Sequence, residues 1–214
     1  MPSSDDQPTP DRSPRMEARR QAMLDAAAAL FFEQGYERVS LGAVVRRSGG
    51  SLSTLYQLFG SKEGLFEAMI TQRCAQIMAP LTAPDLTARE PRETLRIVAH
   101  AFLDVILCPE AQALWRTVMG QGQQFPRLPE IYFRCGPDQL QAAMARYLAC
   151  LHDHRIVHCP EPMRAAQAFC VLTHGDMYYR VVTGTRPPPD ADELARHIDD
   201  AVGMFLAMLR PPGS

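Results

Sequence analysis

Glycine and serine residues divide the first third of the chain into short segments that carry apolar stripes. Gly35 ends the first segment, the pair Gly49-Gly50 separates the second from the third, and Gly60 ends the third. A serine, whose hydroxyl is a good helix N-cap, precedes each of the three later segments: Ser40, Ser51 and Ser61. Helices of about eight residues are too short to be stable alone. This region is therefore predicted to form short helices that persist only by packing against one another.

Apolar residues recur at helical spacing within each of these four segments. The first helix is expected over residues 16–34, with an inward stripe of Met23, Ala27, Leu30 and Phe31. The inward stripes of the next three are Leu41, Val44, Val45 and Ser48; then Leu52, Leu55 and Phe59; then Leu65, Phe66, Met69 and Ile70. The two-glycine turn between the second and third helices is typical of a helix-turn-helix unit.

Longer helices are expected beyond residue 79, where prolines and glycines separate the periodic segments. The predicted helical ranges are 92–107, 110–120, 137–154, 163–184 and 191–210. Residues 120–129 are the most irregular stretch, and they lead into a short segment over 130–136. The chain shows no convincing strand alternation, no internal repeat, and neither a GxGxxG nor a P-loop motif. The expected fold class is all-α.

Charge is distributed unevenly along the chain. Residues 12–79 carry nine basic and six acidic side chains, whereas the remainder carries thirteen basic and eighteen acidic ones. A mildly basic N-terminal third on an acidic body suits a protein that presents one face to a polyanion. The only lysine, Lys62, opens the fourth helix.

Composition favours a soluble cytoplasmic protein without a membrane span. Residues 1–16 are expected to be a disordered leader, because they are polar and proline-rich and lack the apolar core of a signal peptide. No apolar run approaches the roughly 20 residues that a membrane span needs. Six scattered cysteines without a CxxC pair favour reduced thiols over a disulfide framework: Cys74, Cys108, Cys135, Cys150, Cys159 and Cys170.

An ordered series of residues runs through positions 17–77: Ala27, Phe31, Gly35, Ser40, Val44, Gly49, Ser51, Thr54, Leu55, Tyr56, Phe59, Lys62, Glu63, Leu65 and Phe66. In this register the first four helices resemble the DNA-binding domain of TetR/AcrR-type transcriptional regulators. The resemblance implies an N-terminal three-helix DNA-binding domain with a helix-turn-helix, over residues 17–77. It also implies that residues 78–214 form a larger helical domain that binds an effector and dimerises.

The third helix of such a unit enters the major groove with its N-terminal residues first. Small hydroxyl residues there allow close approach and donate hydrogen bonds. The ammonium of Lys62 would add a charge to the anion site at a helix N-terminus, a role that the resemblance also assigns to this lysine. The expected DNA contacts are Ser40, Leu41, Ser51, Leu52, Ser53, Thr54, Tyr56, Gln57 and Lys62. The alternative is that Tyr56 packs on a small core and Lys62 is a solvated surface charge.

Several positions depart from the family pattern. Leu52 stands where a polar or basic residue is frequent, Ser53 where glycine is frequent, and Gly50 where an apolar residue usually packs. Leu58 replaces a residue that usually contacts phosphate. These changes remove polar contacts and predict a modest affinity for DNA, although Leu52 can instead pack on a thymine methyl group. Arg46 and Arg47 are expected to supply general attraction to DNA.

Residues 120–184 resemble, in order, the C-terminal domain of the AefR-like subgroup of this family. The resemblance implies a domain that dimerises through its last two long helices and encloses a ligand cavity. Candidate lining residues are Phe102, Trp115, Met119, Phe125, Phe133, His174, Met177 and Tyr178. An apolar or amphipathic effector is expected. The alternative is that these side chains simply belong to the core.

Four potential metal ligands lie within residues 152–159: His152, His154, His158 and Cys159. The expected helix end and Pro160 place them at a turn, so no metal site and no cofactor are predicted. The expected function is that of a homodimeric transcriptional regulator, most simply a repressor that a small molecule releases from a palindromic operator. A metal- or thiol-responsive regulator and an all-helical enzyme are the alternatives; no catalytic motif supports the enzyme.

Overall fold

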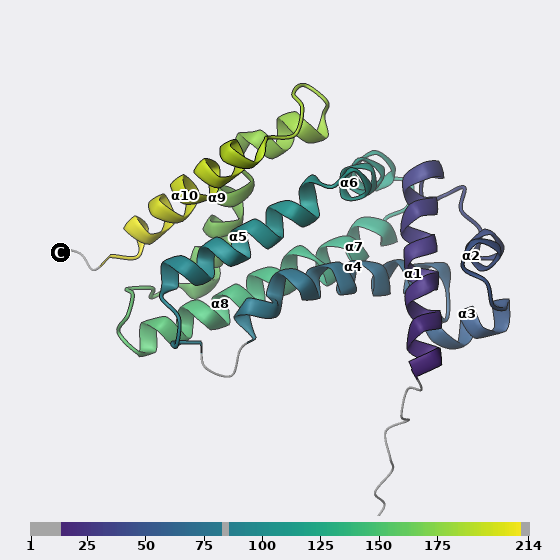
Figure 1. The fold of residues 1–214 in the computed structure, drawn as a ribbon, viewed down its shortest axis with the longest axis horizontal. Helices are drawn as coiled ribbons and strands as arrows, with labels where there is room; N and C mark the ends of the chain where they lie inside the picture. The colour runs from purple at the N-terminus through teal and green to yellow at the C-terminus, as the bar shows by residue number, and fades with distance from the viewer. Residues whose placement is uncertain (1–13, 83–85, 211–214) are drawn as a thin grey trace, which may run out of the picture.

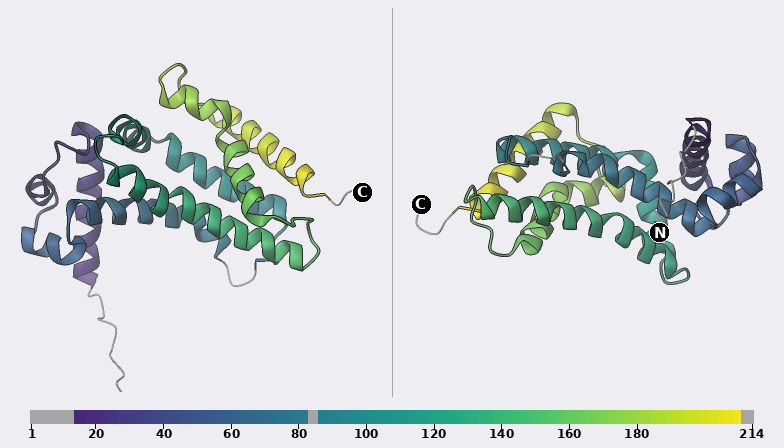
Figure 2. Two further views of the ribbon diagram at one scale, coloured as in Figure 1. Left: turned by 180° about the vertical axis from the view of Figure 1, so that it is seen from behind. Right: turned by 90° about the horizontal axis from the view of Figure 1, so that it is seen from below.

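The computed structural model describes residues 14–82 and 86–210, which fold into helices without any strand (Figure 1). The N-terminal part holds α1 (Pro14–Gln34), α2 (Leu41–Ser48), α3 (Leu52–Phe59) and α4 (Lys62–Met78). A 3-10 turn, η1 (Ala79–Leu81), is followed by α5 (Pro91–Leu107), α6 (Pro109–Gln121), α7 (Arg127–Cys135), α8 (Pro137–Asp153), α9 (Pro162–Val182) and α10 (Ala191–Met208). Figures 1 and 2 show α1–α3 at one end of an elongated molecule and the end of α10 at the other. The prediction of an all-α fold is confirmed.

Serine caps begin α2, α3 and α4 as predicted. The Ser40 hydroxyl accepts a hydrogen bond from the amide of Ala43 at 3.2 Å, and Ser51 and Ser61 cap α3 and α4 in the same way. Each such cap contributes about 1 kcal/mol to helix stability. The caps fix where these short helices start, but packing must hold them in place.

The four N-terminal helices share an apolar core that centres on three aromatic rings. The rings of Phe31 and Phe66 each lie 5.3 Å from the ring of Tyr36, centroid to centroid. Leu55 and Phe59 bury one side of α3 in this core. The predicted stripes of α1 and α4 are buried there as well.

This N-terminal core continues past residue 77, the end of the expected DNA-binding domain. Val118 of α6 and three residues of α7 belong to it: Leu128, Ile131 and Cys135. Outside the core, the guanidinium of Arg134 on α7 binds both carboxylate oxygens of Glu67 on α4, at 3.0 and 2.8 Å. The N-terminal helices therefore rest directly on α6 and α7.

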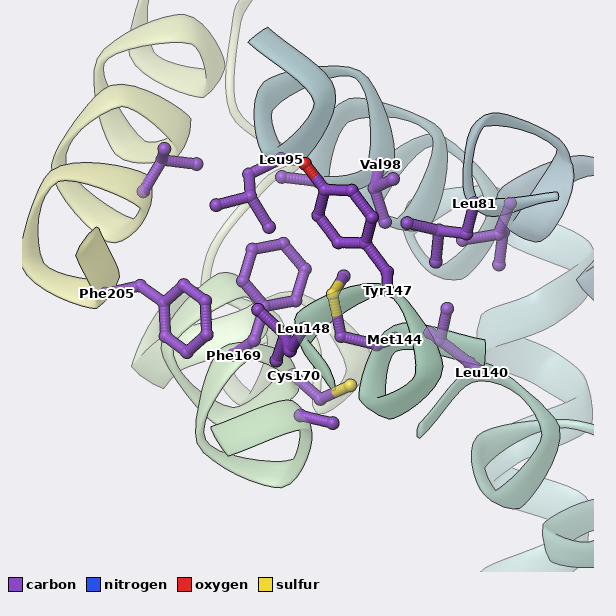
Figure 3. Close-up of a cluster of buried hydrophobic side chains, with 14 of the residues drawn as sticks. Leu81, Leu95, Val98, Leu140, Met144, Tyr147, Leu148, Phe169, Cys170 and Phe205 are labelled. Carbon is purple, nitrogen blue, oxygen red and sulfur yellow. The ribbon is translucent and has the colours of Figure 1, made fainter. Parts of the chain in front are cut away.

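A second core joins α5, α8, α9 and α10. Figure 3 shows Tyr147 and Met144 of α8 inside this core. Leu95 and Val98 of α5 lie on one side of them, and Phe169 of α9 lies on the other. On the far side of this core the ring of Phe169 meets that of Phe205 with centroids 5.2 Å apart, which joins α9 to α10. Ile198, Val202 and Phe205 of α10 are buried in this core, as is Leu209 directly after the helix.

Some sequence predictions about helix limits and faces are wrong. Leu52 was expected to face inward, yet it is 46% exposed, because it opens α3 and the core begins at Leu55. Helix α7 starts at Arg127, inside the stretch expected to be irregular. Residues 1–13 of the expected leader lie outside the described residues, whereas residues 14–16 belong to α1.

Helix α9 is interrupted, although one continuous helix was expected over residues 163–184. Gly175 has φ 51° and ψ −164°, which breaks the helical backbone. Next to the break, Nε2 of His197 on α10 lies 2.6 Å from the carbonyl oxygen of Thr173. A side chain at position 175 would also approach His197, whose Cε1 lies 3.2 Å from the position of a Cβ atom.

Two glycines are required where N-terminal helices approach one another closely. Gly50 has φ +97°, and side-chain atoms of Arg19 and Met23 lie 3.2 Å from where its Cβ would stand. The positive φ by itself favours glycine at this position, because L side chains rarely adopt it. At Gly64 a Cβ would lie only 2.0 Å from the carbonyl oxygen of Phe59, because the end of α3 abuts the start of α4.

Replacing Gly64 by alanine should therefore lower the free energy of unfolding by about 2 kcal/mol or more, because backbone atoms must move apart. Gly120→Ala is the matched control, since nothing beyond the backbone of α6 itself lies within 4 Å of its Cβ position. Chemical denaturation of both variants measures the effect. Equal stabilities would contradict the close approach of α3 and α4.

Candidate DNA-binding face and ligand cavity

Helix α3 exposes one side and buries the other. Leu55 is fully buried and Phe59 nearly so. The exposed residues of its outer side are Ser51, Leu52, Ser53, Tyr56 and Gln57. Tyr56 is 53% exposed, so the alternative in which it packs on a small core is wrong.

A cluster of hydroxyl groups stands at the start of α3. The Ser51 oxygen lies 2.8 Å from that of Ser53 and 2.9 Å from that of Thr54, and it accepts a hydrogen bond from the Thr54 amide. The free amides of a helix N-terminus attract anions. Hydroxyl and amide donors are thus gathered where the exposed side of α3 begins.

Lys62 is anchored by the turn between α1 and α2. Its Nζ donates to the carbonyl of Glu37 at 3.1 Å and lies 4.4 Å from the centre of the Tyr36 ring. Burial lowers the pKa of Lys62, an effect that the carboxylates of Glu63 and Glu37 oppose. An ammonium has three donors, so Lys62 can hold this contact and still bind an anion at the start of α4.

The other expected DNA contacts and basic residues differ in their surroundings. Ser40 is exposed, whereas Leu41 is half-buried against the N-terminal core. Arg46 is exposed, but Arg47 binds both carboxylate oxygens of Glu33 at 2.7 Å. The Glu33 carboxylate offsets the charge that Arg47 would offer to DNA.

A cavity of about 530 Å³ lies among α4–α9 and reaches α1 at Ala28 and Phe31. This volume is in the usual range for small-molecule sites. The structure brings six of the predicted lining residues together: Phe102, Trp115, Met119, Phe133, His174 and Tyr178. They come from four different helices, α5, α6, α7 and α9, which the sequence alone could not place side by side.

Two predicted lining residues do not line this cavity. Met177 is buried in the C-terminal core, because the break at Gly175 changes the faces that the end of α9 presents. Phe125 lies in the turn before α7 and packs against the N-terminal core instead.

Other lining residues were missed. Ile70, Cys74 and Ile77 line the cavity from α4, together with Tyr179 of α9. The α4 residues have the i, i+4, i+7 spacing of an inward face, which was the only signal available. That spacing identifies a buried face but does not distinguish a core from a cavity wall.

The lining is close to neutral in charge. Arg73 and Glu110 are its only side chains with a full charge at neutral pH. Burial lowers the pKa of His174, which favours a neutral imidazole. Burial also raises the pKa of Tyr132 to about 12 and raises that of Tyr178, so both phenols stay protonated.

His152 in the last turn of α8 and the two histidines after the helix do not converge on one point. The helix ends at Asp153, so His154 and His158 do not share a helical face. The amide of Cys159 donates to Nδ1 of His152 at 3.2 Å, and Nδ1 of His154 lies 2.8 Å from the carbonyl of Cys150. Among residues 14–82 and 86–210, no three potential metal ligands come together.

All six cysteines are free thiols, and burial raises the pKa of most of them. It raises the pKa of Cys74 to about 11 and that of Cys170 to about 12, and it also raises the pKa of Cys108, Cys135 and Cys159. A protonated thiol is a poor nucleophile. These surroundings disfavour the thiol-responsive alternative.

No single helix of the described chain is long and apolar enough to cross a membrane. Only α5 and α6 taken together have the required length and composition, and they meet at an angle of 69°.

An exposed, capped second helix of a helix-turn-helix, followed by further helices that enclose a cavity, is typical of a DNA-binding regulatory protein. Residues 23–69 match the family of bacterial regulatory proteins described as the tetR family, and residues 93–211 match the AefR-like transcriptional repressor C-terminal domain. The chain therefore belongs to the TetR family of transcriptional regulators. Proteins of this family are regulators and not enzymes, which confirms that prediction.

Similarity to known proteins supports the assignment to the TetR family. The chain is 31% identical to the transcriptional activator FasR of Mycolicibacterium smegmatis over 96 residues, which are 45% of this chain and 43% of FasR. It therefore spans less than half of that relative. A TetR-family structure from Mesorhizobium loti matches with a TM-score of 0.75, 24% identity, and coverage of 92% of this chain and 99% of that one. The flavonoid-responsive regulator FrrA matches with a TM-score of 0.70 and 27% identity, covering 92% and 100%.

The burial of His174 predicts a pH effect on stability. Folded His174 resists protonation, whereas the unfolded chain takes up a proton near pH 6.5. Its contribution to stability is thus complete above about pH 6.5 and declines as the pH falls. His174→Phe should lose less stability than the natural protein between about pH 7 and 5, as measured by urea denaturation. Parallel losses in the two proteins would show that His174 is readily protonated when folded.

Proposed function

We propose that this protein is a homodimeric repressor that binds a palindromic operator through α3 and leaves it when a small molecule fills the cavity. The observation that carries the proposal is the exposed side of α3. Its polar and apolar side chains are free to meet base edges, while Leu55 and Phe59 hold the helix on the N-terminal core. In a dimer the two α3 helices must stand about one DNA turn apart, roughly 34–36 Å.

The proposed DNA contacts lie on the exposed side of α3 and at the starts of the neighbouring helices. Ser51, Ser53 and Thr54 contact phosphate or base edges at the start of α3. Leu52, Tyr56 and Gln57 face the groove, and Ser40, Leu41 and Lys62 contact the backbone on either side. Residues 17–77 would thus serve DNA binding and residues 78–214 effector binding and dimerisation, in a cytoplasmic protein.

The proposed response to an effector is supported by side chains that the cavity shares with the N-terminal core. Phe31, Met69, Ile70 and Cys74 belong to both. An effector shifts the DNA-binding equilibrium only by its differential affinity for the two states. A difference of about 2.7 kcal/mol changes operator affinity roughly hundredfold.

Selection from randomised duplex DNA with the purified protein tests the proposal. Recovery of an inverted repeat is expected, whereas recovery of no sequence above background at low salt would reject it. On the recovered operator, Tyr56→Phe should weaken binding about threefold to tenfold through one lost hydrogen bond. Tyr179→Phe, an equally exposed tyrosine on α9, is the control. Equal affinities would remove the Tyr56 hydroxyl from the interface.

Dimerisation through α9 and α10 is supported by apolar side chains that both helices expose. Met163 and Val171 lie eight residues apart on α9, and Met204 and Met208 lie four apart on α10; these spacings place each pair on one helix face. Val171 is 61% and Met208 is 60% exposed. A second copy of the chain would cover them.

Met204→Glu should convert the dimer to a monomer, because the carboxylate would lose its hydration in the apolar interface. Phe32→Glu, at an exposed phenylalanine of α1, is the matched control and should remain dimeric. Analytical ultracentrifugation gives the oligomeric state of each. A Met204→Glu dimer as tight as that of the control would place the interface elsewhere.

A further inference from the structure

We propose that the effector is an uncharged, flat aromatic molecule with a hydroxyl group, and that His174 forms a hydrogen bond with this hydroxyl. The inference rests on the proposed function, because it names the chemical class of ligand that the regulatory cavity takes. It depends on three features of the cavity: its aromatic wall, its charge and an unpaired ring nitrogen.

Aromatic rings form a connected series along one wall of the cavity. The ring of Tyr178 lies 6.0 Å from that of Trp115 and 5.8 Å from that of His174, centroid to centroid. The His174 ring lies 6.4 Å from Phe102 and 5.5 Å from Tyr179. All five side chains line the cavity. Stacked and edge-on contacts with such a wall favour a flat aromatic ligand over a branched aliphatic one.

The lining carries no net charge, which disfavours a strongly ionic ligand. Its two charged side chains, Arg73 of α4 and Glu110 of α6, have opposite signs. An ionised ligand would lose its hydration among the aromatic rings. A neutral ligand avoids this cost.

His174 supplies an unused hydrogen-bonding group. Its ring is partly exposed and lines the cavity. Nδ1 is covered by protein atoms and makes no well-aligned hydrogen bond with the described residues, although the backbone of Gly175 lies close to the ring. A buried polar atom without a partner is destabilising. A neutral imidazole has one donor and one acceptor nitrogen, and which nitrogen carries the proton depends on its partners. A hydroxyl group both donates and accepts, so it can pair with the ring in either tautomer.

Trp115 makes the experiment direct, because it is the only tryptophan of the chain and lines the cavity. Its fluorescence is titrated at pH 7 with flavone, 6-hydroxyflavone, flavone-6-carboxylate and benzyltrimethylammonium. We expect 6-hydroxyflavone to bind about fivefold to tenfold more tightly than flavone, the effect of one net hydrogen bond. The carboxylate and the quaternary ammonium should bind at least tenfold more weakly than 6-hydroxyflavone. Tightest binding by either ionic probe, or no quenching by any probe, would overturn the inference.

Two histidine variants test the anchor. His174→Phe keeps a ring of similar size but lacks the nitrogens, so it should bind flavone and 6-hydroxyflavone equally. His100→Phe is the control, because His100 is exposed, pairs with Asp104 on α5 and does not line the cavity. It should keep the full preference for the hydroxyl. A preference that survives in His174→Phe would reject His174 as the anchor.

Binding to the selected operator is measured on the same preparations. The failure of the proposed ligand class can then be distinguished from the failure of the proposed function. Operator binding without any preference among the probes would reject the inference and leave the DNA-binding function standing. A clear preference for 6-hydroxyflavone without operator binding or operator release would reject the proposed function and uphold the ligand class.

Discussion

The apolar interface between the N-terminal helices and α6 and α7 is the contact on which the rest of the structure depends. Helices α2 and α3 have eight residues each and cannot persist in isolation. Leu55 and Phe59 fasten α3 to the N-terminal core, and that core extends to Val118 of α6 and Ile131 of α7. The orientation of the exposed side of α3 is thus set partly by residues more than fifty positions further along the chain.

The same interface borders the cavity. Phe31, Met69, Ile70 and Cys74 pack among the N-terminal helices and also line the space where a ligand would bind. Closely packed side chains transmit small displacements because few voids are present to absorb them. This shared wall would give the proposed ligand a short physical route to α3, through α1 and α4.

The two functional regions depend on different interactions. On α3, hydroxyls and helix amides are arranged for contact with a polyanion, and the anchored ammonium of Lys62 lies at the start of the next helix. In the cavity, burial favours the uncharged forms of His174, Tyr132 and Tyr178. Contact with aromatic side chains is therefore the main interaction that the cavity offers to a ligand. Charge would therefore serve the proposed DNA contacts, whereas shape and single hydrogen bonds would serve the proposed ligand.

The sequence by itself determined the helices, their serine caps, the two-glycine turn and the family, because capping and helical periodicity act over only a few residues. It also identified most side chains of the aromatic wall as apolar and inward. Only the tertiary structure decided which inward faces meet a core and which meet a cavity, as Met177 and Cys74 demonstrate. It also decided the exposure of Leu52, the break at Gly175 and the anchoring of Lys62 to Glu37. The reason is that these features depend on contacts between elements distant in sequence. A local sequence pattern does not indicate which other element a helix face will contact.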